Sequence, residues 1–161
     1  MSLQMIVIEM TQAFATAWGN QAKDLLEEYL GRVGDELGAQ SGGIIKFTPS
    51  MSSMGFVSSW PDSAQGEMGT GTEPYEWLMN HLHTENGFYF SPDSWLPEAG
   101  SERALFGGWR CPHVICVPIF RGELKGFAFW GSENPVSWSI NELRGLKQVG
   151  NIFGIGLDKI S

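Results

Sequence analysis

The sequence of 161 residues predicts an α+β domain built on a central antiparallel sheet of five or six strands. Short apolar stretches occur in pairs separated by tight turns, which is typical of antiparallel hairpins. Long stretches with apolar residues at every third or fourth position occur at the two ends of the chain, as in amphipathic helices. We therefore expect the N- and C-terminal helices to pack together on one face of the sheet. The short helices and loops of the middle segment would then cover the other face.

Residues 11–37 predict a long amphipathic helix. Apolar side chains recur at three- and four-residue steps along this stretch, with charged side chains between them. Its glycines weaken a helix, so they indicate either a break near residues 18–20 or close approach by another helix. Gly38 has the position of a C-terminal cap. We interpret residues 1–10 as a tag remnant or flexible lead-in, and residues 11–160 as a single domain.

A hairpin and an irregular segment follow. Residues 44–47 and 54–60 predict two strands joined by a turn. Residues 61–72 are rich in Gly, Ser and acidic residues without periodicity, so we expect a mobile loop there. The rest of the middle segment predicts a short helix at residues 75–82, a brief strand at 87–90 and a second short helix at 98–106.

The central hairpin is predicted at residues 114–130, where two apolar strands flank a tight polar turn. Two turns are compatible with this spacing. One of them pairs Arg121 with Leu124. It also places Pro118 opposite Phe127, at a site where no backbone N–H is needed. The alternative turn removes a ladder hydrogen bond at Pro118, so we favour the first register.

A second long helix closes the chain. Ser139 and Glu142 have the spacing of a capping box, which predicts a helix starting at Ser139. Apolar residues then recur at helical spacing almost to the C-terminus. Four glycines weaken this helix and indicate close contact with the first helix or with a partner chain. They are Gly145, Gly150, Gly154 and Gly156.

Composition and charge exclude several classes of partner. The net charge of −8 and the absence of a basic run argue against binding to nucleic acid or to anionic membranes. No apolar run approaches the roughly 18 residues that a membrane-spanning helix needs. Two cysteines, without a larger even set, fit a reducing compartment better than a disulfide framework. We expect a cytoplasmic protein with no nucleic-acid partner and no membrane insertion.

Cys111, His113 and Cys116 are the candidate metal ligands. Tetrahedral zinc needs four converging donors. On an extended strand Cys111 and His113 share one face, whereas Cys116 points to the other. We therefore interpret Cys116 as a small buried core residue and expect no metal site.

No catalytic pattern stands out. The chain has no Gly-x-Ser-x-Gly segment, no phosphate-binding P-loop and no His-Glu-x-x-His segment. Glu98 and Glu102 are expected on a solvated helix face, because no partner base or nucleophile accompanies them. We expect no catalytic residues and no enzymatic activity, and the sequence identifies no cofactor.

Aromatic residues gather in or beside the middle segment, and the chain has seven tryptophans. One interpretation is an aromatic enclosure for a flat ligand. The other is that a loop-rich cap needs large side chains to bury enough area. The candidate ligand-binding residues are Trp60, Trp77, His81, Phe90, Trp95 and Trp109.

Residues 117–119, 124–127 and 138–143 resemble the corresponding segments of GAF domains. Residues 73–77, and residues 96–99 together with 102–103, are similar to a bacterial GAF subgroup found with histidine kinases and diguanylate cyclases. The resemblance implies a ligand pocket on one face of the sheet and terminal helices that pair on the other, often across a dimer. The chain lacks the signature of cyclic-nucleotide-binding members and the helical Cys or His of bilin-binding relatives. We therefore expect neither a cyclic nucleotide nor a covalent bilin.

The resemblance implies a non-catalytic sensory or regulatory domain of a signalling protein. Its expected partners are an unidentified small molecule between sheet and cap, a second copy that pairs through the terminal helices, and a covalently attached kinase or cyclase output domain. A ligand-free dimerisation or interaction domain is the main alternative. A second alternative is an enzyme similar to free methionine-sulfoxide reductases, although the chain lacks that family's cysteine segment.

Overall fold

The computed structural model describes residues 2–61, 70–84 and 87–160, which contain five α-helices and six strands. Most of the loop expected at residues 61–72 lies outside these ranges. In chain order the elements are α1 (Leu3–Thr16), α2 (Gly19–Leu37), β1 (Ser41–Phe47), β2 (Ser53–Trp60), β3 (Thr70–Gly71), α3 (Glu76–His83), β4 (Phe88–Phe90), the 3₁₀ turn η1 (Pro97–Ala99), α4 (Gly100–Gly108), β5 (His113–Arg121), β6 (Glu123–Ser132) and α5 (Ile140–Ile160).

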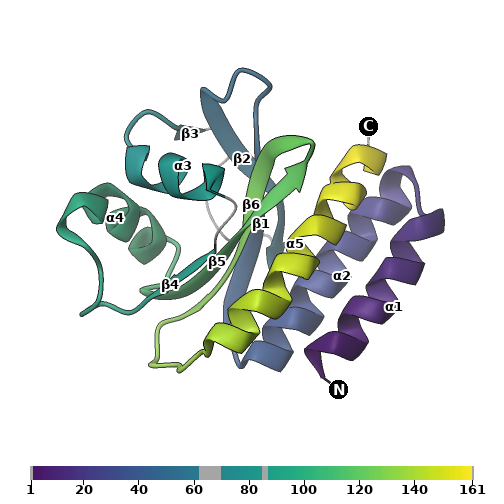
Figure 1. The fold of residues 1–161 in the computed structure, drawn as a ribbon, viewed down its shortest axis with the longest axis horizontal. Helices are drawn as coiled ribbons and strands as arrows, with labels where there is room; N and C mark the ends of the chain where they lie inside the picture. Colours follow the sequence, from purple (N-terminus) through teal and green to yellow (C-terminus); the bar gives the residue numbers. More distant parts are fainter. Residues whose placement is uncertain (1, 62–69, 85–86, 161) are drawn as a thin grey trace.

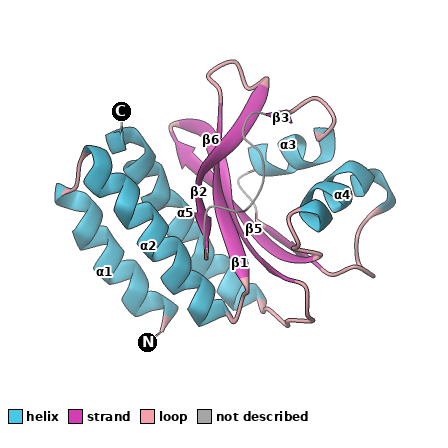
Figure 2. Cartoon of the chain, turned by 180° about the vertical axis from the view of Figure 1, so that it is seen from behind, coloured by secondary structure: helices cyan, strands magenta, loops and turns pink. Residues whose placement is uncertain are grey.

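The strands form one antiparallel sheet with the order β3-β2-β1-β6-β5-β4. Helices α1, α2 and α5 lie side by side on one face, which we call the helix face (Figure 1). Helices α3 and α4 lie on the opposite face, which we call the cap face (Figure 2). This arrangement confirms the predicted fold class and the pairing of the terminal helices. No helix within the described residues combines the length and apolar character needed to cross a membrane.

The N-terminal helical pattern forms two helices and begins earlier than the sequence predicts. Residues 3–10, interpreted as part of a tag remnant or flexible lead-in, belong to α1. The expectation of a flexible lead-in is corrected for these residues, because Ile6 and Met10 are buried against the other terminal helices and fix α1 to the domain. The break falls at Ala17–Trp18, as the glycines indicated. Gly38 adopts a φ of 69° and caps α2, as predicted.

The central hairpin has the predicted register over most of its length. Pro118 lies opposite Phe127, as expected. Arg121 does not pair with Leu124, however, because the register shifts near the turn. Gly122 alone forms the tip with a φ of 79°, a left-handed conformation that glycine adopts without steric cost. Arg121 therefore pairs with the residue that directly follows Gly122.

The start of α5 is capped as predicted. The backbone N–H of Glu142 donates to Ser139 Oγ at 3.2 Å, and the backbone N–H of Ser139 donates to Glu142 Oε1 at 3.1 Å. Two orphan amides at the helix end are thus satisfied reciprocally, so the capping box is confirmed.

The glycines of α5 allow close packing within the chain. A Cβ at Gly150 would lie 2.6 Å from the Pro118 carbonyl oxygen, and one at Gly154 would lie 2.6 Å from that of Phe120. A Cβ at Gly156 would lie 2.8 Å from the ring of Phe14 in α1, so the predicted contact with the first helix is present. The close approach of α5 to the backbone of β5 was not predicted.

Side-chain alternation along β6 divides the interior into two cores. Phe127 and Phe129 point to the cap face, whereas Ala128 and Trp130 point to the helix face. Each layer of helices therefore covers its own apolar cluster on a shared sheet.

Candidate functional site

The cap-face core is an aromatic cluster with Phe106 at its centre. Phe106 comes from α4 and is fully buried. Its ring centroid lies between 5.5 and 6.4 Å from five other aromatic rings. These rings belong to Phe88, Trp95, Trp109, Phe127 and Phe129. The sequence did not identify Phe106, although it is the only aromatic residue in the predicted helix at 98–106.

The sheet supplies the floor of this cluster. Trp109 stacks on Phe129 of β6, with centroids 5.0 Å apart and an interplanar angle of 15°. Trp109 also meets Phe56 of β2 edge to face at 5.1 Å. Both geometries are favourable for aromatic pairs, and they hold the end of α4 to the sheet.

The rim of the cluster is built by α3, β4 and the loop after β4. Trp77 stacks on His81 at 4.9 Å and meets Phe90 edge to face at 5.5 Å. Phe90 in turn stacks on Trp95 at 4.6 Å. The Trp95 indole N–H donates to the Pro112 carbonyl oxygen at 3.4 Å. Since Trp77, His81 and Phe90 are only half-buried, these rings separate the central cluster from solvent.

The structure thus brings together five of the six candidate residues, namely Trp77, His81, Phe90, Trp95 and Trp109. Trp60 is the exception, because it lies on the helix face. A Cβ at Gly31 or Gly34 of α2 would come within 2.8 or 2.5 Å of the Trp60 ring. Val57 has no partner in the β1–β2 ladder, so one extra residue reverses the side-chain alternation between Phe56 and Trp60. The grouping of Trp60 with the cap residues is corrected.

Glu102 of α4 is buried, with a relative exposure of 1%, so the prediction that it lies on a solvated helix face is wrong. Its Oε2 accepts a hydrogen bond from the backbone N–H of Leu78 at 2.8 Å. Leu78 lies in the first turn of α3, where unpaired backbone N–H groups and the helix dipole favour a carboxylate. Glu102 therefore caps α3 from another helix and joins the two helices of the cap.

Both cysteines belong to the cap-face core. The prediction that Cys111 and Cys116 point to opposite faces of the sheet is wrong, because β5 begins at His113 and strand alternation does not extend back to Cys111. Burial raises the pKa of Cys111 to about 11 and that of Cys116 well above its usual value. Both thiols are thus protonated at neutral pH. Within the described ranges, no three His, Cys, Asp or Glu side chains form a group that could hold a metal ion.

No family model and no curated protein matches the sequence. Solved structures do match. The phycocyanobilin-bound GAF domain from a cyanobacterial phytochrome aligns over 99% of this chain and 96% of its own, with 12% identity and a TM-score of 0.79. The GAF domain of a phosphoenolpyruvate-protein phosphotransferase from Coxiella burnetii aligns over 98% and 93%, with 14% identity and a TM-score of 0.76.

The GAF domain of a two-component sensor histidine kinase from Bacillus halodurans aligns over 81% of this chain and 92% of its own, with 12% identity and a TM-score of 0.61. These alignments agree with the layers described above, in which one sheet separates the terminal helices from a cap of short helices. The chain has the fold of a GAF domain.

Proposed function

We propose that the chain is a non-catalytic regulatory domain of a signalling protein, which receives a small molecule on its cap face and transmits the signal through its terminal helices. The observation that carries this proposal is the position of β5. Cys116 and Val114 on one side of this strand belong to the aromatic core, while Gly150 and Gly154 place α5 against the strand backbone. A ligand that shifts β5 would therefore move α5 without an intermediate layer.

The chemistry of the cluster favours a flat, largely apolar ligand. The rings at the rim are stacked or edge-to-face, and a planar molecule can replace one ring in such an arrangement. Because Phe106 is fully buried, we expect entry by displacement of the half-buried Trp77 and Phe90 at the rim. The phytochrome domain with this fold holds a bilin. A bilin here would bind without a thioether link, because both thiols are buried and protonated.

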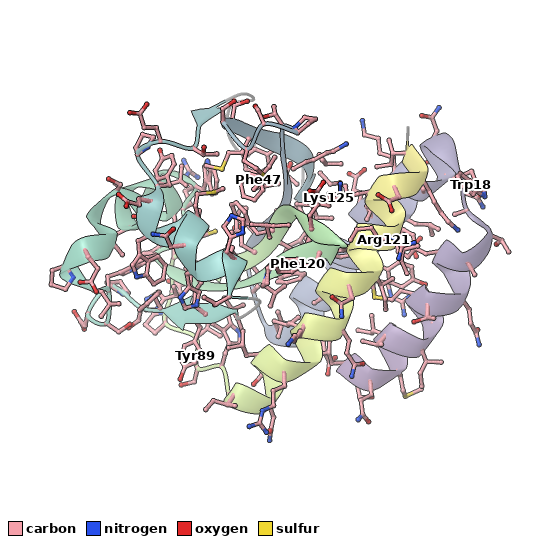
Figure 3. All side chains as sticks on the ribbon, turned by 45° about the horizontal axis from the view of Figure 1, so that its top comes forward. Trp18, Phe47, Tyr89, Phe120, Arg121 and Lys125 are labelled. Atoms are coloured by element: carbon pink, nitrogen blue, oxygen red, sulfur yellow. The ribbon has the colours of Figure 1, made fainter. Side chains whose placement is uncertain are left out.

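The outer side of the helical layer supports a further part of this proposal, a homodimer. Met5 and Ile8 on α1 are 57% and 62% exposed, and Trp18 after α1 is 64% exposed. Figure 3 shows Trp18 at the outer edge of the helical layer, far from the cap. Exposed apolar side chains of this size are typical of surfaces that contact another protein. We propose that α1 pairs with a second copy and that an attached kinase or cyclase reads the arrangement of the helices.

The packing of the cluster favours a second candidate, a ligand-free dimerisation domain. Phe106, Phe127 and Phe129 are fully buried, and Trp95 and Trp109 are each only 9% exposed. In this case the rings act only as a core, and the terminal helices alone carry the function.

Tryptophan fluorescence distinguishes the two candidates. Biliverdin and a set of planar heterocycles are titrated into the wild type, Trp95→Phe and Trp60→Phe. Cap-face binding predicts quenching that Trp95→Phe reduces and that Trp60→Phe, with its change on the helix face, leaves intact. Absence of quenching and of thermal stabilisation by every compound, together with a concentration-dependent dimer in sedimentation, supports the ligand-free domain. Quenching that depends on Trp60 contradicts the cap-face site.

A further inference from the structure

A depression lies at the sheet edge formed by β4 and borders the rim of the aromatic cluster at Phe90. It has a volume of ≈ 820 Å³ and is lined by residues 89–94, by residues 135–138 and by His113 at the start of β5. Tyr89 pairs with Ile115, whose side chain belongs to the helix-face core, so Tyr89 also points to the helix face. Figure 3 shows Tyr89 where the cap approaches the start of α5. The depression therefore opens between the edge strand and the segment that leads into α5.

Its lining combines aromatic walls with polar groups. The aromatic lining residues are Tyr89, which is 45% exposed, the half-buried Phe90 and Trp138, which is 6% exposed. The side chains of Tyr89, Asp93 and His113 make no hydrogen bond or ion pair with another described residue, so their polar atoms are available to a ligand. Asp93 is the only Asp, Glu, Lys or Arg among the described lining residues.

We propose that this depression binds a flat aromatic molecule that carries an ammonium group. The ring would lie against Tyr89 and Trp138, and the ammonium would pair with the Asp93 carboxylate. The His113 imidazole offers a further hydrogen-bonding group for a ring substituent. A volume of ≈ 820 Å³ falls within the range of small-molecule pockets. An anionic ligand is disfavoured, because the lining has no Lys or Arg and the chain carries a net charge of −8.

The position of the site gives the ligand access to the signalling helix. Residues 135–138 directly precede Ser139, whose side chain caps α5. A bound molecule would touch the edge strand and this segment together, so occupancy would be sensed at the first turn of α5. The proposal does not depend on a ligand at the cap-face cluster, because Tyr89 points to the helix face, whereas its neighbour Phe90, which borders both sites, points to the cap face.

An NMR titration of backbone amides with tryptamine tests the proposal, with indole-3-acetate as the control of similar ring and opposite charge. We expect tryptamine to shift the amides of residues 89–94, 113 and 135–142 and to bind about tenfold more tightly than indole-3-acetate, as one charge-assisted hydrogen bond allows. Asp93→Asn should remove this preference, and Tyr89→Ala should weaken both compounds. Leu96→Ala, at an exposed position outside the lining, should bind tryptamine as the wild type does.

Three results would overturn the proposal. The first is the absence of shifts at millimolar tryptamine, and the second is equal affinity for the two compounds. The third is an unchanged preference in Asp93→Asn. Because the shifts are followed residue by residue, binding at the cap-face cluster would shift the amides of α3, α4 and residues 89–94 without those of residues 135–142, and would count against this site. Retention of the wild-type spectrum elsewhere in each variant shows that the variant is folded.

Discussion

Replacement of Phe106 by alanine tests whether the aromatic cluster holds the cap to the sheet. The phenyl ring is fully buried and meets five other rings. Removal of a buried phenyl ring typically lowers the free energy of unfolding by about 3–5 kcal/mol, because the transfer energy is lost and a cavity remains. Against a total of about 5–15 kcal/mol, the variant should still fold but with much lower stability. For a chain of this size the loss corresponds to a fall in melting temperature of about 6–20 °C.

Urea unfolding followed by circular dichroism measures the change, with Leu96→Ala as the control. Leu96 is 40% exposed, so its truncation should change the free energy by no more than about 0.5 kcal/mol. The cavity left by Phe106→Ala is apolar and should bind benzene, which would raise the urea midpoint of the variant but not that of the wild type. A loss below about 1 kcal/mol, with no effect of benzene, would show that the rings do not form a packed core.

Three further predictions concern other parts of the chain. Arg32 and, to a smaller extent, Tyr29 donate hydrogen bonds to the Glu9 carboxylate and lower its pKa. Glu9 therefore stabilises the fold above its unfolded pKa, and this effect is lost as pH falls through the folded pKa. The urea midpoint of Glu9→Gln should drop less between pH 5 and pH 3 than that of the wild type. Gly154→Ala should destabilise by about 1–3 kcal/mol in urea unfolding, because its Cβ would meet β5, whereas Gly100→Ala, with open space around it, should not. Native protein should not react with a thiol reagent such as DTNB at pH 8, because burial raises the pKa of Cys111 to about 11. The protein unfolded in urea should react with it. Fast labelling of the native protein would contradict the burial of the thiols.

The sequence predicts the fold well where local chemistry decides the structure. The capping box at Ser139 and the position of Pro118 opposite Phe127 depend on residues close in sequence or on strand alternation, and both are present. Trp60 differs, because one unpaired residue in β2 moves its side chain to the other face. Nothing local in the sequence marks that bulge, so the candidate site included a residue that packs on α2.

Other errors came from contacts between distant segments. Glu102 has the composition of a surface helix position, and only its partner 24 residues earlier makes burial favourable. The start of α1 lacks a partner within its own segment, and Ile6 and Met10 are buried only because α2 and α5 pack against α1. Such tertiary contacts override local patterns, which is why the helices and strands were predicted better than the surroundings of single residues.

The division of the sheet into two faces also bears on how a signal could cross it. Phe129 packs in the cap-face cluster, while its neighbour Trp130 donates its indole N–H to the Leu30 carbonyl oxygen of α2 at 2.9 Å. Displacement of β6 by a ligand would therefore strain a buried hydrogen bond to α2, just as displacement of β5 would press on α5 at Gly154. The neighbouring strands β6 and β5 thus contact two different helices, α2 and α5. Under the proposed function, a ligand that binds one position of β5 or β6 more tightly would favour one arrangement of α2 and α5, because differential affinity is what shifts a conformational equilibrium.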